Sequence, residues 1–196
     1  HRAETALYRG NARGWQENNY VRADQLLIKQ QQGQFIGEGN VQSLLYNVRR
    51  KENGKETNAP VYVSSQKMTY NRDSRLVRYE TDVDIRQGTD RIVGGLANIY
   101  LDERNELSRS EIENNVTITQ PNRRAVGDYA EYIAATESVT LRGNPARVDD
   151  AENGSSSGGE MTVYLRNNKV VSDGKSKQNT AGRIRSVYKV KNSLPN

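Results

Sequence analysis

Met161-Thr162-Val163-Tyr164-Leu165 places every second side chain, those of Met161, Val163 and Leu165, on one side of an extended chain. The same period of two recurs in Val116-Thr117-Ile118-Thr119, in Ser138-Val139-Thr140-Leu141 and in Asp82-Val83-Asp84-Ile85-Arg86. Alternation of this kind is typical of strands that are buried on one face. Gly, Asn, Asp and Ser interrupt the segments at short intervals. The sequence therefore predicts an ordered, all-β chain with strands of ~5–7 residues.

The composition agrees with half-buried strands. Only 34% of the 196 residues are hydrophobic and the mean hydropathy is −0.92, which by itself raises the question of disorder. A strand buried on one face, however, needs only half of its residues to be apolar. The strongest helical alternative runs from Arg22 to Gln32, where Leu26 and Leu27 precede a Gln run. Leu26 and Ile28 also fit a strand, and the internal repeat favours the strand.

Several function classes are excluded by the residue types. The chain has no Cys and a single His at position 1. This excludes thiol nucleophiles, metal sites with Cys ligands, and catalytic triads or metal clusters built on His. The net charge of +5 raises nucleic acid as a partner, but acidic residues are interleaved throughout and no RNA-binding sheet motif is present. Asp82/Asp84 and Asp149/Asp150 are interpreted as surface groups. We therefore expect no enzyme, metal site, cofactor or nucleic-acid partner.

Two short blocks recur along the chain. The first reads small residue, Asp/Gln/Gly, any, apolar, any, apolar, and the second contains paired Gly, Asn, Asp or Thr residues. The first block occupies Ala23–Ile28, Ser65–Tyr70, Gly94–Ile99, Gly127–Tyr132 and Gly158–Val163, and the second occupies Gly39–Val41, Thr81–Val83, Asn114–Val116 and Gly143–Pro145. Together they predict a unit of about 29 residues with two strands joined by a polar turn.

One such unit cannot bury its apolar face alone, whereas stacked units can. The sequence therefore predicts one elongated domain, 1–196, built as a slender sandwich, jelly roll or solenoid with open sheet edges. Gly10-Asn11-Ala12 is a truncated copy, so the chain is expected to start partway through a repeat. The longer spacings between blocks predict a charged surface loop at 49–59 and a flexible loop at 152–158.

At this point the residues resemble a known family. Arg124 to Gly143, which reads Arg-Ala-Val-Gly-Asp-Tyr-Ala-Glu-Tyr-Ile-Ala-Ala-Thr-Glu-Ser-Val-Thr-Leu-Arg-Gly, is similar to the OstA/LptA family of periplasmic lipopolysaccharide-transport proteins. Gly10–Trp15, Tyr20–Leu26 and the closing Gly182–Tyr188 add to the resemblance.

The resemblance implies an elongated, twisted, OstA-like β-jelly roll whose apolar interior shelters the acyl chains of lipid A. It implies a carrier or bridge of lipopolysaccharide in the periplasm of a Gram-negative-type bacterium, paired by edge strands with other jelly-roll proteins or end to end with itself. Neither a signal peptide nor an anchor is present in this sequence. An LptA-like, an LptC-like and an LptD amino-terminal role all remain open.

The inward rows are the candidate lipid-binding residues, because an acyl chain needs an apolar lining. They are Leu26, Ile28, Val41, Met68, Tyr70, Val83, Ile85, Ile99, Leu101, Val116, Ile118, Tyr132, Val139, Leu141, Met161, Val163 and Leu165. Basic residues that suit lipid A phosphates are Arg49, Arg50, Lys51, Arg123, Arg124, Arg142 and Arg147. Trp15 is expected to cap the core.

Two alternatives remain open on the residues alone. The first is a structural β-solenoid or adhesin-like repeat in which the same apolar rows fill a solid core without lipid. The second is a hydrolase or lyase on a β-scaffold, which converging carboxylates would indicate and which no visible constellation supports.

Overall fold

The computed structural model describes residues 5–16, 19–46, 50–52, 55–57, 59–165, 169–173 and 185–188. Strands dominate the described residues, and none of these residues forms a helix long and apolar enough to cross a membrane. The strands are β1 Thr5–Gln16, β2 Asn19–Lys29, β3 Gln34–Leu45, β4 Arg50–Glu52, β5 Lys55–Thr57, β6 Val61–Asn71, β7 Leu76–Gln87, β8 Asp90–Leu101, β9 Leu107–Gln120, β10 Arg123–Ile133, β11 Ser138–Asp150, β12 Gly154–Tyr164, β13 Lys169–Asp173 and β14 Arg185–Tyr188.

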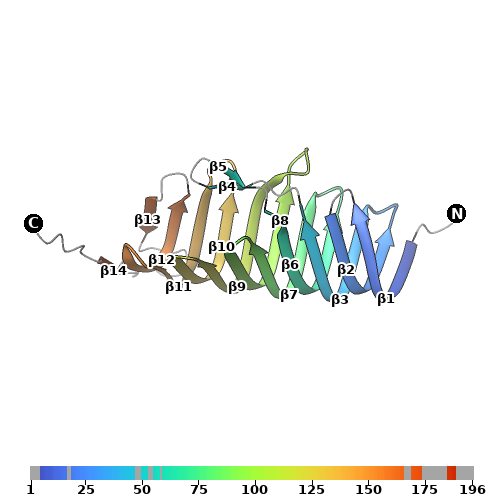
Figure 1. Cartoon of the computed structure of the whole chain (residues 1–196), viewed down its shortest axis with the longest axis horizontal. Helices are drawn as coiled ribbons and strands as arrows, with labels where there is room; N and C mark the ends of the chain where they lie inside the picture. Colours follow the sequence, from blue (N-terminus) through green and yellow to red (C-terminus); the bar gives the residue numbers. More distant parts are fainter. Residues whose placement is uncertain are drawn as a thin grey trace, which may run out of the picture.

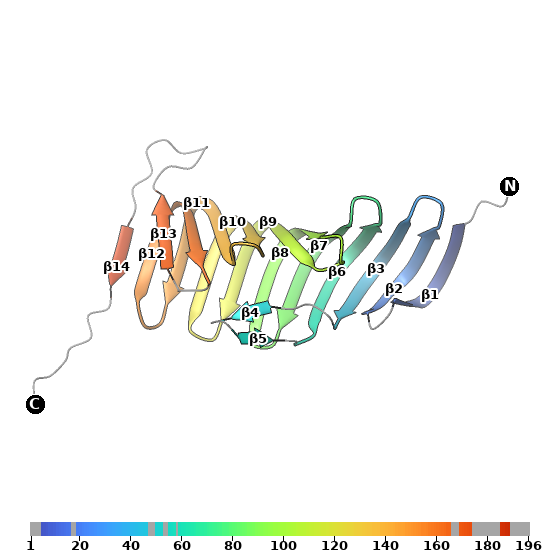
Figure 2. The ribbon, with the colours of Figure 1, turned by 90° about the horizontal axis from the view of Figure 1, so that it is seen from above.

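A single antiparallel sheet organises the chain. Its 12 strands follow the order β1-β2-β3-β6-β7-β8-β9-β10-β11-β12-β13, and β14 pairs with the other half of the β12 edge. The sheet does not close on itself, so β1 lies at one end of an elongated body and β13 and β14 at the other (Figures 1 and 2). The short β4–β5 hairpin is separate from this sheet.

Each long strand of this sheet except β13 and β14 bends in its middle. Pairing between neighbours shifts register there, as between Glu80 and Val83 of β7 or between Gly127 and Tyr129 of β10. In β1, β3, β7 and β9 the bend contains two consecutive residues with positive φ, a conformation that suits Gly and Asn. These pairs are Gly10-Asn11, Gly39-Asn40, Thr81-Asp82 and Asn114-Asn115. Both repeated blocks of the sequence therefore mark corners within strands.

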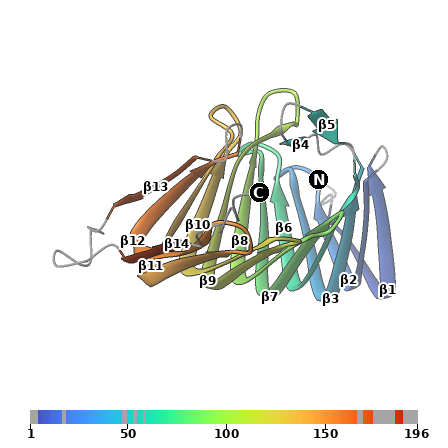
Figure 3. The ribbon, with the colours of Figure 1, turned by 60° about the vertical axis from the view of Figure 1, so that its left-hand side comes forward.

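The corners divide the sheet into two arms that face each other (Figure 3). Arm A is the half that carries Leu26, Met68 and Met161, and arm B is the half that carries Val21, Val63 and Val148. Residues of both arms form one hydrophobic cluster. The side of each arm that faces this cluster is called inner, and the opposite side outer. The result is the twisted, all-β jelly roll that the sequence predicts.

Some local expectations are wrong. The second block is a corner inside a strand and not a turn between strands, so the strands have 11–14 residues from β1 to β12, apart from β4 and β5. Residues Gly154–Ser157 pair with Tyr188–Arg185 of β14, so strand β12 already begins at Gly154. The flexible loop expected at 152–158 is therefore only a turn at 151–153. Within the charged segment 49–59 lies the β4–β5 hairpin. At 22–32, by contrast, the strand that the internal repeat favoured over a helix is confirmed, as β2 followed by a turn.

Candidate functional site

The inner face of the roll consists of continuous rows of side chains that cross the sheet from strand to strand. In arm A, Ile28 pairs with Phe35, Phe35 with Tyr70, Tyr70 with Val77 and Val77 with Ile99. The same row then continues through Ser110, Tyr132, Val139 and Val163. Cross-strand neighbours on one face of a sheet lie in contact distance. The interior is therefore a nearly unbroken apolar track along the long axis of the molecule.

Arm B presents a matching row. It runs through Val21, Ser43, Val63, Ile85, Ile92, Ile118, Ala125 and Val148. A corner row between the arms includes Val41, Val83 and Val116, which are at most 2% exposed. The corner is tightly packed, because an ideal Cβ on Gly94 would lie 2.6 Å from Ile112 Cγ2. Burial thus increases from the rims of the two arms toward the corner.

The structure places the predicted residues on this inner face. Buried are Leu26, Val41, Met68, Val83, Val116, Leu141, Met161 and Val163, and half-buried are Ile28, Tyr70, Ile85, Ile99, Ile118, Tyr132 and Val139. Leu101 and Leu165 lie half-buried at the rim of arm A. The strand parity that the alternation predicts is therefore correct, whereas contact with a lipid stays a prediction.

The alternation in the sequence does not predict several of the inner residues. The unpredicted members of the core include Val21, Val63, Ile112, Val148 and, largest of all, Tyr79. Side chains alternate again beyond each corner. The spacing between the last inward residue before a corner and the first one after it is not always two residues. In β7, for example, Tyr79 and Val83 both face inward across the corner at Thr81 and Asp82. Counting four residues back from Val83 would have identified Tyr79.

Tyr79 reaches across the interior from arm A. Its side chain is 1% exposed, and burial raises the pKa of Tyr79 to about 12, with Ser43 of arm B offsetting part of that shift. Ser43 itself is 4% exposed. A neutral hydroxyl therefore remains at this position at physiological pH.

Three of the four basic residues that are proposed for phosphates and have described side chains pair with acids. Arg123 pairs with Asp150 at 3.0 Å, Arg142 with Glu160 at 2.6 Å and Arg147 with Asp149 at 2.7 Å. Arg49 lies outside the described residues, as do the side chains of Arg50 and Lys51. Arg124 is exposed.

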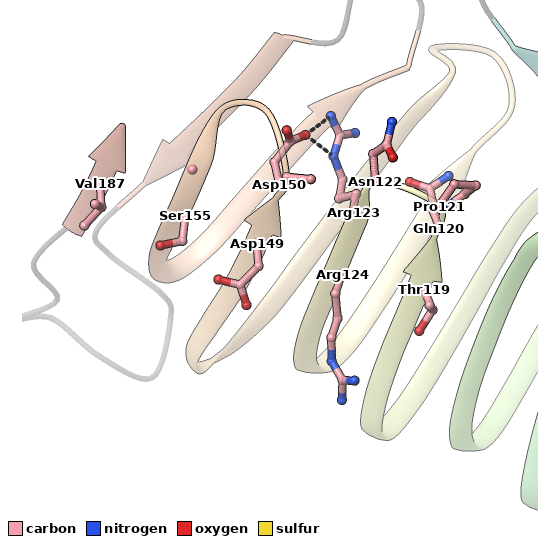
Figure 4. Close-up of a pocket in the computed structure, with 12 residues that line it drawn as sticks. Thr119, Gln120, Pro121, Asn122, Arg123, Arg124, Asp149, Asp150, Ser155 and Val187 are labelled. Carbon is pink, nitrogen blue, oxygen red and sulfur yellow. Dashed lines mark hydrogen bonds and ion pairs between the residues drawn. The ribbon is translucent and has the colours of Figure 1, made fainter. Parts of the chain in front are cut away.

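A shallow cleft of about 470 Å³ lies at the rim of arm B, where the β9–β10 and β11–β12 turns adjoin β14 (Figure 4). The Arg123–Asp150 pair lies in its wall, and Arg124 and Asp149 project from neighbouring strands. Among the described residues, no group of three His, Cys, Asp or Glu side chains could hold a metal ion.

Trp15 does not cap the core. Its side chain is 69% exposed on the outer face of arm B, where its ring centroid lies 5.5 Å from that of Tyr20. Trp15 pairs with Tyr20, whereas the adjacent Gly14 pairs with the buried Val21. The alternation of the strand therefore turns Trp15 outward.

Asp84 is a structural ion-pair centre. Its carboxylate accepts hydrogen bonds from Arg86 at 2.7 Å and from Arg91 at 2.8 Å. The hydrogen bond from Arg86, opposed by partial burial and assisted by Arg91, lowers the pKa of Asp84 from 3.8 to about 2. Asp82 lies exposed at the β7 corner, where its φ is 54°. The two acids therefore do not form a catalytic pair.

The low pKa of Asp84 makes its contribution to stability depend on pH. A carboxyl whose pKa is depressed in the folded state stabilises the protein above about pH 4, and this contribution disappears as the pH falls to about 2. With solvent screening, we expect Asp84→Asn to lower the free energy of unfolding by about 1 kcal/mol at pH 7. Urea unfolding at pH 7 and pH 2.5 measures this, and a difference of equal size at both pH values would contradict it.

Comparisons with known proteins agree with this architecture. The family model described as LptA/(LptD N-terminal domain) LPS transport protein matches residues 62–170, which is more than half of the chain. The search of curated proteins finds no match.

Among solved structures, the fold is similar to that of LptH from Pseudomonas aeruginosa. LptH is described as the LptA-homologous periplasmic component of the conserved lipopolysaccharide transport device. The TM-score is 0.58 at 17% identity, over 67% of this chain and 96% of LptH. At this identity the likeness concerns the fold. The family match, which covers the sheet from β6 into β13, shows that the chain belongs to the LptA/LptD N-terminal domain family of lipopolysaccharide-transport proteins.

Proposed function

We propose that this protein is a periplasmic carrier that binds lipopolysaccharide and relays it toward the outer membrane, with the acyl chains in the interior of the roll. The observation that carries the proposal is the continuous apolar inner face along an unclosed sheet of 12 strands. An acyl chain that buries ten methylene groups there would gain roughly 8 kcal/mol. This gain would offset part of the free energy needed to extract the chain from a lipid phase. Membership of the lipopolysaccharide-transport family supports the ligand class, and the likeness to the periplasmic LptH supports the location.

The half-buried residues of the inner rows are the proposed contact surface. Tyr70, Ile99 and Ile85 pack against the buried core and retain some exposure. They lie between the tightly packed corner and the rims of the arms. A lipid chain that enters between the arms would meet these residues first, while its sugars remain in water.

Sheet edges supply the proposed contacts with partner proteins. Strand β1 pairs with β2 alone among the described strands, and β13 and β14 cover the two halves of β12 at the other end. An edge strand presents N–H and C=O groups that can pair with a strand of another chain. Jelly-roll partners, or further copies of this chain, would thereby extend the apolar track.

Photo-crosslinking tests the carrier function. A benzophenone amino acid at Tyr70 or Tyr132, which are inward and half-buried, is expected to crosslink to purified lipopolysaccharide in a saturable manner. The matched controls are Thr69 and Glu131, the preceding residues on the outer face of the same strands. Circular dichroism verifies that each variant folds.

Crosslinks from both inward positions and not from the outward pair would support the carrier. Folded variants that crosslink equally from both faces, or from neither, would contradict it. Absence of crosslinks from both faces would favour a structural β-repeat with a solid core. The buried Tyr79 and the tightly packed corner would then be parts of that core.

A further inference from the structure

The outer faces of the two arms differ in charge. Among the described side chains, the two outer rows of arm B carry six arginines, Arg13, Arg22, Arg86, Arg91, Arg124 and Arg147. The acids of these rows, among the described side chains, are Asp84 and Asp149. Arm B therefore has an excess of four positive charges on one surface.

Arm A is balanced by comparison. Its outer rows carry the basic residues Arg9, Lys29, Lys67, Arg78, Arg109 and Arg142. Among the described side chains they carry as many acids, namely Glu38, Glu80, Glu111, Glu113, Glu131 and Glu160. Several of these groups pair with one another, such as Arg142 with Glu160 and Arg109 with Glu131. Among the described side chains, the outer rows of arm B therefore carry a net positive charge that the outer rows of arm A lack.

An aromatic patch lies at the β1 end of the same face. Trp15 pairs with Tyr20, Tyr20 with Leu44 and Leu44 with Tyr62, and Tyr46 directly follows the end of β3 at Leu45. Trp15 is 69%, Tyr62 54% and Tyr46 46% exposed. These five side chains, the aromatic patch, cover β1, β2, β3 and β6 over roughly 14 Å at ~4.8 Å per strand. Exposed apolar side chains that gather in this way mark an interaction surface.

The arginines continue the row where the aromatic patch ends. Tyr62 pairs with Arg86, and Arg86 pairs with Arg91 on the next strand. Trp and Tyr are enriched at the level of lipid headgroups, where a ring has both apolar and polar surroundings. Arg suits phosphate oxygens through its planar fork of donors. A sheet surface that is both basic and aromatic combines the two features that an anionic bilayer attracts.

We propose that the outer face of arm B docks on the surface of an anionic lipid bilayer. The aromatic patch lies at the headgroup level, and the arginines other than those paired with Asp84 and Asp149 contact lipid phosphates. This surface is on the opposite side of the sheet from the inner rows, so docking is independent of acyl-chain binding in the interior. It would hold the long axis of the carrier against a membrane.

Trp15 is the single tryptophan of the chain and reports on docking directly. The full chain is mixed with vesicles of phosphatidylglycerol and phosphatidylcholine in equal parts, or of phosphatidylcholine alone, without lipopolysaccharide. We expect co-sedimentation with the anionic vesicles, a blue shift of Trp15 emission, and its quenching by brominated lipids. We expect at least about tenfold weaker binding to phosphatidylcholine, because the electrostatic attraction is lost.

Charge reversal on each arm separates the docking face from the overall charge. Arg13→Glu/Arg124→Glu on arm B is expected to weaken sedimentation with anionic vesicles about tenfold or more. The matched variant Arg9→Glu/Lys29→Glu changes the net charge equally on arm A and is expected to stay within about twofold. Tyr62→Ser is expected to reduce binding and the blue shift without changing the charge.

Equal losses in the two double variants would overturn the proposal, because net charge alone would then explain binding. Binding to both kinds of vesicle alike would overturn it as well. So would sedimentation without quenching of Trp15, or complete competition by inorganic polyphosphate at low concentration, since these results would indicate a site for soluble polyanions. Crosslinking of lipopolysaccharide from Tyr132 is measured separately, so failure of one proposal leaves the other testable.

Discussion

Leu26→Ala is expected to lower the free energy of unfolding by about 3 kcal/mol. Leu26 is 1% exposed on the inner face of arm A, and its Cδ2 lies close to Gly37 of the neighbouring strand. Truncation removes buried methyl groups and leaves a cavity that the paired strands on both sides cannot fill by moving. Chemical denaturation monitored by circular dichroism measures the loss.

Leu27→Ala is the matched control. Leu27 is the next residue of β2, but it faces outward and is half-buried, so its truncation should cost less than about 1 kcal/mol. The pair of variants tests strand parity as well as packing. Equal losses at the two positions would contradict the assignment of Leu26 to the interior.

Gly127→Ala is expected to destabilise the protein by about 2 kcal/mol. An ideal Cβ at this corner would lie 2.6 Å from the carbonyl oxygen of Arg142 and 3.0 Å from Leu141 Cδ1. The oxygen belongs to the backbone of β11, which is paired with β10 on both sides of the corner, at Val126 and at Tyr129. The clash therefore cannot be relieved by a side-chain rotation, and overpacking of this kind strains the backbone.

Gly14→Ala is the control for this second substitution. Gly14 also faces inward, but an added Cβ would meet only side-chain atoms, Val21 Cγ1 at 3.3 Å and Phe35 Cζ at 3.4 Å. These side chains can shift by a few tenths of an ångström, so the cost should stay below about 1 kcal/mol. Thermal unfolding of the two variants measures the contrast. A larger loss for Gly14→Ala would show that the β10–β11 corner is not the tighter one.

The repeated blocks explain how far the fold could be predicted. Val41, Val83 and Val116 each follow a pair of polar or Gly residues, and this spacing correctly indicates a tandem all-β architecture. The interpretation of the pair as a turn between strands is wrong, because a pair of residues with positive φ also bends a strand without ending it. A single sequence does not distinguish the two outcomes, since both use the same Gly and Asn residues.

The residues that face inward could be predicted for one half of each bent strand and less well for the half on the other side of the corner. The alternation of Met161, Val163 and Leu165 identifies their shared face, and the structure confirms it. Tyr79 and Ile112 belong to the same core, and each precedes a predicted inward Val by four residues, a spacing that keeps the same face only when the strand continues through the corner. Trp15, in contrast, was expected to be buried and is exposed. Large aromatic residues are highly buried on average, and the sequence does not give the pairing register that turns this one outward.

The amino-acid sequence by itself determined the all-β class, the tandem repeat, the resemblance to the lipopolysaccharide-transport family and the parity of the predicted inward rows. These properties depend on residues close together in the chain, for which the period of two and the corner residues are sufficient. Only the tertiary structure decided which arm each half-strand joins, which distant side chains form one core, and that the excess arginines share one outer face. Those relations arise from the pairing register of 12 strands, and a shift of one residue at a corner reverses every side chain beyond it.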